Sequence, residues 1–596
     1  MAEVIAGIGF AFQAYSSLVE VYKVLSALHG LDKEAPVLLW KLRMQQVRFE
    51  VFGRHWGLDK PGFNAFIEEE GLLGIITTTL SSMKQTFEDG SKLDKVYGVQ
   101  IPQSGIALIS SNASTASDED SIKSKKFGLG TRFRWVLRDK ARFETLIVDL
   151  KDYNDGLHSL LRLREAAVLE NLAQSMLLHG ATTPQSSQSL SQASMETASI
   201  QGSSTVVSKR VSSQVLYQQL QKSVQTKRFL LEPPVPAAQG LLQTRSMTLD
   251  QGLVRYAPLN SPSDVRLLAE VMPVVISGSS DREPTPAVID WRNTNVDDGV
   301  KKKVLHRLDR LAELLSDKIP KPDDLRVLEC LGYFEDAHAP RHGIVHRLPA
   351  GSAIRAPVTL YDLMARQHER VPDLNERFDL ARALSTSILR LHDCGWLHTS
   401  FRSSNVIFFH QQHVERSDQE IASAAWGSID FKQPYLIGLS YAKPTNPEEV
   451  TLEQSQSTLE HSLYRDPALV VQNGASIDDL EKERVRQQMR HDYYSLGIVL
   501  LEIGLWDQIT TFWKPKYTRQ SFLDKLQSSY VPKLGPKMGA VYRDVVLRLL
   551  TMSIVLSHQS VTSKGGSGDA TIFDADEQTQ NTADWSIATE LLKCSA

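Results

Sequence analysis

The residues best placed for chemistry lie in the run His398–Asn405, between an apolar helix predicted at Leu374–Leu391 and a strand predicted at Val406–Phe409. The hydroxyl of Ser400 is neutral at pH 7, so it can donate or accept a hydrogen bond but cannot supply a carboxylate. Ser400 and Arg402 could also act only within the loop, because such side chains hydrogen-bond neighbouring backbone groups. The run therefore offers hydrogen bonding without an acidic group.

This run resembles the catalytic loop of protein kinases, H-R-D-L-x-x-x-N, with its usual lead-in at Gly395–His398. Three further segments follow in the order and spacing of that family. Leu436–Ser440 lies where the family has D-F-G-L-S, Tyr464–Pro467 resembles the end of the activation segment, and Asp492–Glu502 resembles the central helix of the large lobe. The resemblance covers about residues 285–595 and implies a bilobal α+β protein-kinase-like fold.

The departures from the kinase pattern concern the groups that carry out phosphoryl transfer. Ser400 occupies the position of the Asp that accepts the proton of the substrate hydroxyl. The D-F-G motif has become Leu436, Ile437 and Gly438, and Leu cannot ligate Mg²⁺, although the loop Asn is retained as Asn405. The resemblance therefore implies a pseudokinase with no catalytic residue and no metal ligand. Its degenerate catalytic loop comprises His398, Ser400, Arg402 and Asn405.

The nucleotide-binding positions are altered as well. Val288–Arg292 lies where the family has V-A-I-K, which puts Trp291 or Arg292 at the Lys position depending on register, and no G-x-G-x-x-G precedes it. Glu313 could be the helix acid that pairs with this position, or an ordinary solvated charge. Arg292 and Glu313 are thus candidates for cofactor binding, with ATP and Mg²⁺ expected only if the chain is an active kinase, and otherwise no cofactor. The family uses Asp492 structurally, to brace the catalytic-loop backbone.

The N-terminal region is predicted to be an all-α bundle, because strand signals are nearly absent. Helical patterns cover residues 1–27, Glu34–Trp56, Pro61–Phe87 and Arg134–Ala173, and Ser110–Lys126 indicates a loop. The apolar face of the first helix comprises Val4, Ile8, Ala11, Tyr15, Leu18, Tyr22 and Leu25, and that of the second Leu38, Leu42, Gln45, Phe49 and Phe52.

Three blocks of this region resemble the fungal HeLo domain, and the resemblance extends to about residue 225. The blocks are Met1–Leu25, Trp40–Leu58 and Arg134–Leu161. The family includes a prion-controlled heterokaryon-incompatibility effector, so the resemblance implies regulated cell death. It also implies self-association through the domain and insertion of the first helix into a membrane.

The composition of the first helix is compatible with membrane contact. No charge appears between Glu3 and Glu20, and Gly7 and Gly9 would allow close helix approach in lipid. The stretch is too short and too polar to predict a spanning helix, and the lack of an early basic residue argues against a secretory signal. The same side chains could instead form only the core face of the first bundle helix. The predicted membrane-contact residues are Ile5, Ile8, Phe10 and Phe12.

The chain of 596 residues is therefore predicted to be multidomain. A HeLo-like bundle covers 1–180, a Ser/Thr/Gln-rich linker 181–213, a connecting helix with a proline-containing segment 214–284, and the kinase-like domain 285–596. The 66 basic and 70 acidic residues give a net charge of −4, so nucleic acid is not an expected partner. The three cysteines are too few and too scattered for a disulfide framework or a zinc site, which fits a reducing compartment.

The function predicted from these features is a non-catalytic signalling or cell-death effector. A pseudokinase would restrain the HeLo bundle, and release would expose the first helix for self-association or contact with membrane lipid. The upstream signalling protein is not identified by the sequence. The expected location is the cytoplasm, with relocation to the plasma membrane on activation. Two alternatives stay open: an active Ser/Thr-type kinase with a HeLo targeting domain, and a soluble interaction adaptor with no membrane role.

Overall fold

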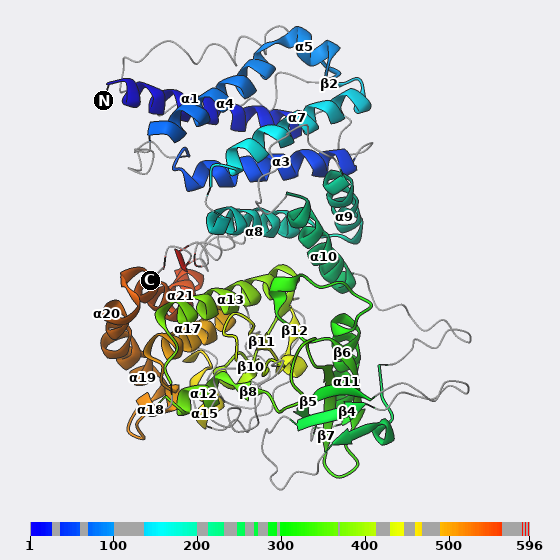
Figure 1. The fold of residues 1–596 in the computed structure, drawn as a ribbon, viewed down its shortest axis with the longest axis vertical. Helices are drawn as coiled ribbons and strands as arrows, with labels where there is room; N and C mark the ends of the chain where they lie inside the picture. The colour runs from blue at the N-terminus through cyan, green and yellow to red at the C-terminus, as the bar shows by residue number, and fades with distance from the viewer. Residues whose placement is uncertain are drawn as a thin grey trace, which may run out of the picture. The chain divides into compact units, whose positions relative to one another are not determined.

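The computed structural model divides into two compact units, Met1–Leu231 and Glu232–Ala596 (Figure 1). It describes residues 2–26, 36–59, 70–100, 136–161, 163–199, 213–231, 247–256, 267–271, 284–294, 298–367, 370–412, 429–445, 459–467, 489–562, 587, 590–591 and 594. The loop predicted at Ser110–Lys126 lies outside the described residues. Each unit is described by itself below.

The first unit is helical, as the sequence predicts. Its helices are α1 (Ala2–Ser26), α3 (Pro36–His55), α4 (Glu70–Glu88), α5 (Gly90–Lys95), α7 (Lys140–His158), α8 (Leu163–Gly180), α9 (Pro184–Ser199) and α10 (Ser213–Leu231). A short antiparallel pair joins β1 (Val99–Gln100) to β2 (Val136–Leu137). The prediction of a single helix over Arg134–Ala173 is therefore wrong. This range contains strand β2 and two separate helices, α7 and α8.

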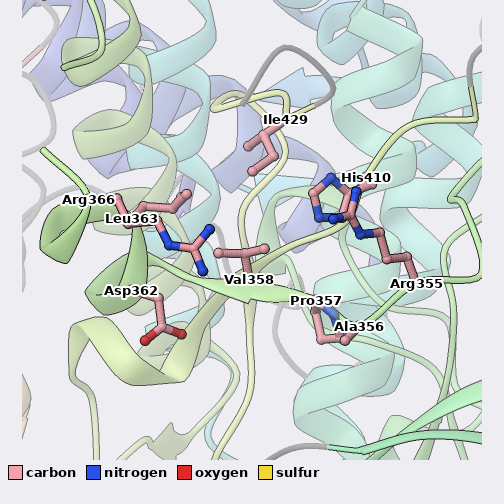
Figure 2. A pocket seen from close by; sticks show the side chains of 9 residues that line it. All are labelled: Arg355, Ala356, Pro357, Val358, Asp362, Leu363, Arg366, His410 and Ile429. Carbon is pink, nitrogen blue, oxygen red and sulfur yellow. The ribbon is translucent and has the colours of Figure 1, made fainter. Parts of the chain in front are cut away.

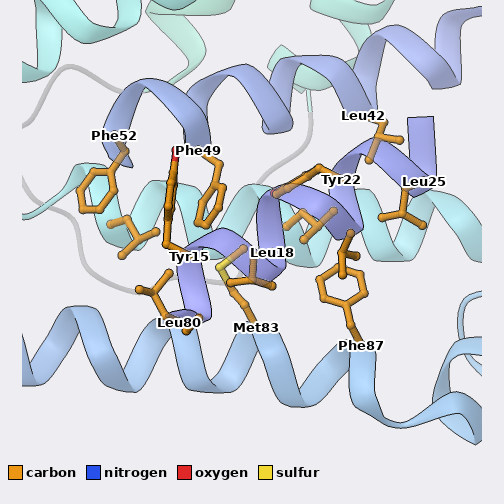
Figure 3. Close-up of a cluster of buried hydrophobic side chains, with 14 of the residues drawn as sticks. Tyr15, Leu18, Tyr22, Leu25, Leu42, Phe49, Phe52, Leu80, Met83 and Phe87 are labelled. Carbon is orange, nitrogen blue, oxygen red and sulfur yellow. The ribbon is translucent and has the colours of Figure 1, made fainter. Parts of the chain in front are cut away.

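The core of this unit forms where α1 packs against α3 and α4 (Figure 3). Tyr15 of α1 lies against Phe49 of α3, with ring centroids 5.1 Å apart. Gly53 permits this approach, because a Cβ there would collide with the Tyr15 ring. The predicted face of α3 is confirmed, and that of α1 is confirmed from Ala11 to Leu25; Ile8 is half-buried, and the Val4 side chain lies outside the described residues. The buried members are Ala11, Tyr15, Leu18, Tyr22 and Leu25 on α1 and Leu38, Leu42, Gln45, Phe49 and Phe52 on α3.

Helix α9 corrects the linker predicted at 181–213. Its buried hydroxyl groups donate hydrogen bonds to backbone carbonyls of the same helix. Ser194 Oγ donates to the carbonyl of Leu190 (2.8 Å), and Thr197 Oγ1 donates to that of Ala193 (2.7 Å). These small residues and Leu190 are buried and allow α9 to pack along α10 and α3. The helix predicted after the linker is α10, which belongs to the first unit and not to a connection.

A buried ion cluster links α3 to α7 and α8. Arg48 Nη1 lies 2.9 Å from Asp155 Oδ1, and Arg48 Nη2 lies 2.7 Å from Glu170 Oε1. The Arg48 and Glu170 side chains are only 4% and 6% exposed. Burial opposes ionisation of Glu170, but Arg48 and His158 outweigh it and lower the pKa of Glu170 to about 2. The pair is thus charged and almost fully desolvated.

We expect Arg48→Met to destabilise the first unit by about 3–5 kcal/mol, because Glu170 would remain buried without its cation. The loss of unfolding free energy would be measured in the full chain by hydrogen exchange of the α3 and α8 amides at increasing urea concentrations. Arg54→Met is the matched control, since Arg54 is exposed on the same helix and its pairing with Glu50 at 3.6 Å is worth less than about 1 kcal/mol. Equal stability of the two variants would contradict the assigned role of the cluster.

The second unit contains a five-stranded antiparallel sheet in the order β3-β4-β5-β7-β6. The strands are β3 (Val254–Tyr256), β4 (Leu267–Val271), β5 (Thr285–Asn293), β6 (Cys330–Glu335) and β7 (Arg341–Arg347). Helix α11 (Asp298–Leu315) follows β5 and packs against β6. Strands β3 and β4 extend the sheet from β5, so the sheet begins before residue 285. The prediction that 214–284 only connects two domains is therefore wrong.

The rest of the second unit is mainly helical, with two small sheets. Its helices are α12 (Leu360–Ala365), α13 (Leu374–Asp393), α15 (Leu459–Leu463), α17 (Met489–Leu505), α18 (Ile509–Phe512), α19 (Arg519–Lys525), α20 (Leu534–Met538) and α21 (Ala540–Thr562). Its strands are β8 (Val358–Thr359), β9 (Trp396–Leu397), β10 (Val406–Phe408), β11 (Tyr435–Leu436) and β12 (Lys443–Pro444). The predicted apolar helix after Tyr493 is α17, which is buried almost throughout and packs against α13 and α21.

Candidate functional site

The loop after β9 is fixed by the carboxylate of Asp492, which α17 places in the interior. Asp492 Oδ2 accepts the backbone N–H of His398 at 2.7 Å, and Oδ1 accepts that of Thr399 at 2.9 Å. His392 Nε2 lies 3.0 Å from Oδ2. Burial would raise the pKa of Asp492, but these partners outweigh burial and lower it. Thr399 has a φ of 61°, and its Oγ1 donates to the carbonyl of Tyr441 at 2.7 Å, which helps to hold this strained conformation.

The polar side chains of the loop bond to one another. Arg402 Nη1 donates to Ser400 Oγ at 2.7 Å, and its Nε donates to Ser404 Oγ at 2.8 Å. Asn405 Nδ2 donates to the carbonyl of Ser400 at 2.6 Å. The Ser400 hydroxyl oxygen therefore accepts from a permanent cation, which cannot take the hydroxyl proton. These bonds order the loop.

His398 is fully buried, and neither of its ring nitrogens has a hydrogen-bond partner among the described residues. Its ring lies against that of Phe401, with centroids 5.6 Å apart. Desolvation lowers the pKa of His398 to about 4, against a smaller opposing effect of Asp492. The imidazole is therefore neutral at pH 7 and packs as an apolar ring.

The segment Leu436–Gly438 lies beside this loop. Leu436 is buried and pairs with Val406 where β11 meets β10. Gly438 has a φ of 78°, and a Cβ there would collide with the Asn405 side chain, so only glycine fits. Its N–H donates to Asp290 Oδ2 at 2.9 Å. The structure thus brings Asn405, Gly438 and Asp290 together, beside the middle of strand β5.

Asp290 is the residue that the sequence reasoning missed. Side chains alternate along β5, so one face carries Ala287, Ile289 and Trp291, and the other carries Val288, Asp290 and Arg292. The expectation that Trp291 or Arg292 takes the Lys position depended on register, and the residue of β5 that accepts the N–H of Gly438 is Asp290. The sequence did contain a signal for this residue, because an acid in the middle of an apolar strand is expected to be buried. A buried carboxyl group needs a hydrogen-bond donor, so such a residue indicates a specific polar contact.

Arg292 and Glu313 are not brought together as a cofactor pair. The Arg292 guanidinium carbon lies 4.6 Å from the ring centroid of Tyr441, and its Nε is buried without a hydrogen-bond partner among the described residues. Desolvation lowers the pKa of Arg292 to about 10. Glu313 is half-buried on α11 and makes no ion pair with Arg292 within that part of the chain. Arg292 is held by an aromatic ring and not by an acid.

The residues around the loop do not fit magnesium-bound ATP. An apolar cluster fills the space between β5 and β10, comprising Val288, Leu328, Leu348, Ile407, Phe409 and Ile437. Asp290 and Asn405 are near each other, but no group of three or more His, Cys, Asp or Glu side chains in the described ranges is placed to hold a metal ion.

The proposed membrane-contact residues lie at the start of α1. Phe10 is 38% exposed, whereas Phe12 and Ile8 are half-buried and Ile8 packs against the core. The side chain of Ile5 lies outside the described residues. Phe10 lines an open hollow with Thr77 and Thr78 of α4. Among the helices that the structure describes, none is both long enough and apolar enough to cross a bilayer.

Comparison with protein families gives one result, for the first unit. Residues 4–192 match the HeLo family model, described as prion-inhibition and propagation. This match confirms the resemblance of the N-terminal bundle and runs into α9, which the sequence had assigned to a linker. It does not extend to the second unit. Among curated proteins, none matches the chain.

The buried neutral state of His398 predicts a pH dependence of stability. The unfolded chain takes up a proton near pH 6.5, but the folded chain does so only near pH 4. Stability is therefore present above pH 6.5 and is lost as the pH falls towards 4, by up to about 3 kcal/mol for this group. His398→Gln should lack that loss, measured by hydrogen exchange of α17 amides between pH 4 and 7. His338→Gln, at an exposed position, is the control. Parallel profiles for wild type and His398→Gln would refute the assignment.

Proposed function

We propose that this chain is a non-catalytic signalling effector of the fungal cell-death and incompatibility type, in which a kinase-like second unit regulates a HeLo bundle. The HeLo match over residues 4–192 supports the signalling role. The single observation that carries the non-catalytic assignment is the hydrogen bond from Gly438 N–H to the buried carboxylate of Asp290. In the kinase-like arrangement that we propose, this acid would take the place of the cation that a kinase needs.

The kinase-like assignment of the second unit is supported by the order of its elements. An antiparallel sheet with one helix precedes a helical part built on α17. The resemblance to kinases includes an aspartate at the start of this helix that braces the catalytic loop, and Asp492 bonds the backbone of that loop. These features agree with the motif order in the sequence. These features concern the arrangement of helices and strands and not the side chains that would transfer a phosphate, so they do not support catalysis.

The chemistry of the loop argues against phosphoryl transfer. A general base contributes about 10²–10⁴ to a rate, and a donor or metal that stabilises the transition state contributes a few kcal/mol. Ser400 accepts a hydrogen bond from Arg402, and its own side chain is a hydroxyl and not a carboxylate. Leu436 is buried and has no oxygen in its side chain. The active-kinase alternative would need other residues to supply both missing acids, and Asp290 is engaged by Gly438.

We expect the full chain to show no magnesium-dependent thermal stabilisation by ATP and no phosphate transfer. The comparison is a variant carrying Ser400→Asp and Leu436→Asp, which restores both acids but retains the Asp290 charge. Asn405→Ala is the control for any activity observed. Turnover by the wild type that Asn405→Ala abolishes would establish an active kinase and overturn the proposal.

We further propose that the HeLo bundle associates with itself and contacts membrane lipid through the N-terminal half of α1. The exposure of Phe10 supports this, because the side chain is not committed to the core. The proposed location is the cytoplasm, with relocation to the plasma membrane when the second unit releases the bundle. The upstream signalling protein is a partner of the second unit in this scheme. A soluble adaptor without membrane contact is the competing function.

Leakage of phosphatidylcholine–phosphatidylserine vesicles separates these functions. Residues 1–231 should release more dye than the full chain, and Phe10→Ser should weaken membrane association by about thirtyfold, since burying a Phe side chain contributes about 2 kcal/mol. Met195→Ser is the matched control, because Met195 is exposed on α9 of the same unit. Absence of leakage, or equal leakage by Phe10→Ser, would favour the adaptor.

A further inference from the structure

A pocket of about 260 Å³ lies beside α12 in the second unit (Figure 2). Its walls are fixed by backbone bonds. Strand β8 pairs with β10 at Val358 and Phe408, and the N–H of Ala353 donates to the carbonyl of His410 at 2.7 Å. Thr359 caps α12 by accepting the N–H of Asp362 at 3.0 Å. Neither the loop His398–Asn405 nor Gly438 lines this pocket, so it is separate from the site described above.

Two arginines line the pocket, and the described residues hold no ion pair for either of them. Arg355 and Arg366 are both exposed, and Figure 2 shows the Arg355 guanidinium beside the His410 ring and that of Arg366 turned towards Val358. The one acid of the lining, Asp362, accepts the Thr359 hydroxyl at 2.7 Å. With Asp362 counted, the two arginines leave the lining with a net positive charge of one.

The remaining lining supplies a hydrogen-bonding ring and an apolar wall. His410 is buried, and desolvation together with the nearby Arg355 charge lowers its pKa, so the ring is neutral at pH 7. Val358 and Leu363 form an apolar surface beside the two guanidinium groups. A ligand that fits has a compact anionic head and a short organic stem. The volume is below the range of pockets that hold nucleotides and other drug-sized ligands.

We propose that this pocket binds a phosphate monoester attached to a short organic group. Guanidinium groups bind phosphate through paired N–H donors in a planar fork, and the several oxygens of a phosphate monoester can accept from two such forks at once. The monoester could come from a free phosphorylated metabolite or from a phosphorylated side chain of a protein, which share this chemistry. The inference does not depend on the proposed absence of catalysis.

Calorimetric titration of the full chain tests the proposal with three probes. These are glycerol 3-phosphate, a phosphoserine heptapeptide and the same peptide without phosphate. We expect one or both phosphorylated probes to bind and the unphosphorylated peptide not to bind. Arg355→Ala and Arg366→Ala should each weaken binding by roughly tenfold or more, because each removes a charge-assisted contact. Arg366→Lys should be intermediate, since Lys keeps the charge without the fork.

Two further variants distinguish a ligand site from a structural role. Asp362→Asn removes the negative charge from the lining and should tighten binding by about threefold. Arg543→Ala should leave the affinity unchanged, because Arg543 lies outside the pocket and pairs with Asp544 at 2.8 Å. Thermal unfolding would verify that each variant is folded. The proposal is overturned if neither phosphorylated probe binds, if the unphosphorylated peptide binds equally, or if folded Arg355→Ala and Arg366→Ala bind as tightly as wild type.

Discussion

The buried carboxylate of Asp290 is the constraint on which the second unit depends. A desolvated charge of this kind is tolerated only with hydrogen-bond donors, and the N–H of Gly438 is one of them at 2.9 Å. The bond joins the central strand of the sheet to the segment after β11, so the sheet and the helical part share a fixed contact. Because Gly438 has a positive φ and lies against Asn405, the backbone has little freedom to withdraw that donor.

The loop beside this contact is held firmly without being reactive. Asp492 accepts two consecutive backbone N–H groups, and Thr399 keeps a left-handed conformation that costs about 1–3 kcal/mol. Around this framework, the positions that would carry reactive groups contain the hydroxyl of Ser400 and the buried side chain of Leu436. Under the proposed function, this loop would contribute through binding and not through turnover.

The sequence predicted the helices that bury one face, because their apolar residues recur at helical spacing. The inward positions of α3, and those of α1 from Ala11 onwards, follow that period. Helix α9 was not predicted because Ser and Thr are weak helix formers, and its stability comes from tertiary packing that composition does not reveal. Asp290 was not predicted as a site residue for a different reason. A shift of one residue in strand register exchanges the two faces, and the sequence alone does not fix the register of β5.

The two halves of α1 limit how a HeLo bundle of this kind could act on a membrane. Tyr15, Leu18, Tyr22 and Leu25 are buried, and withdrawing each would cost roughly 1.5–3 kcal/mol. The sum is comparable to the whole stability of a typical domain, so complete release of the helix would amount to unfolding the bundle. The Phe10 side chain carries less of this penalty, because it is already 38% exposed, whereas Ile8 packs against the core. Contact through this half can therefore precede release, and complete insertion requires that lipid or a second copy bury the same side chains.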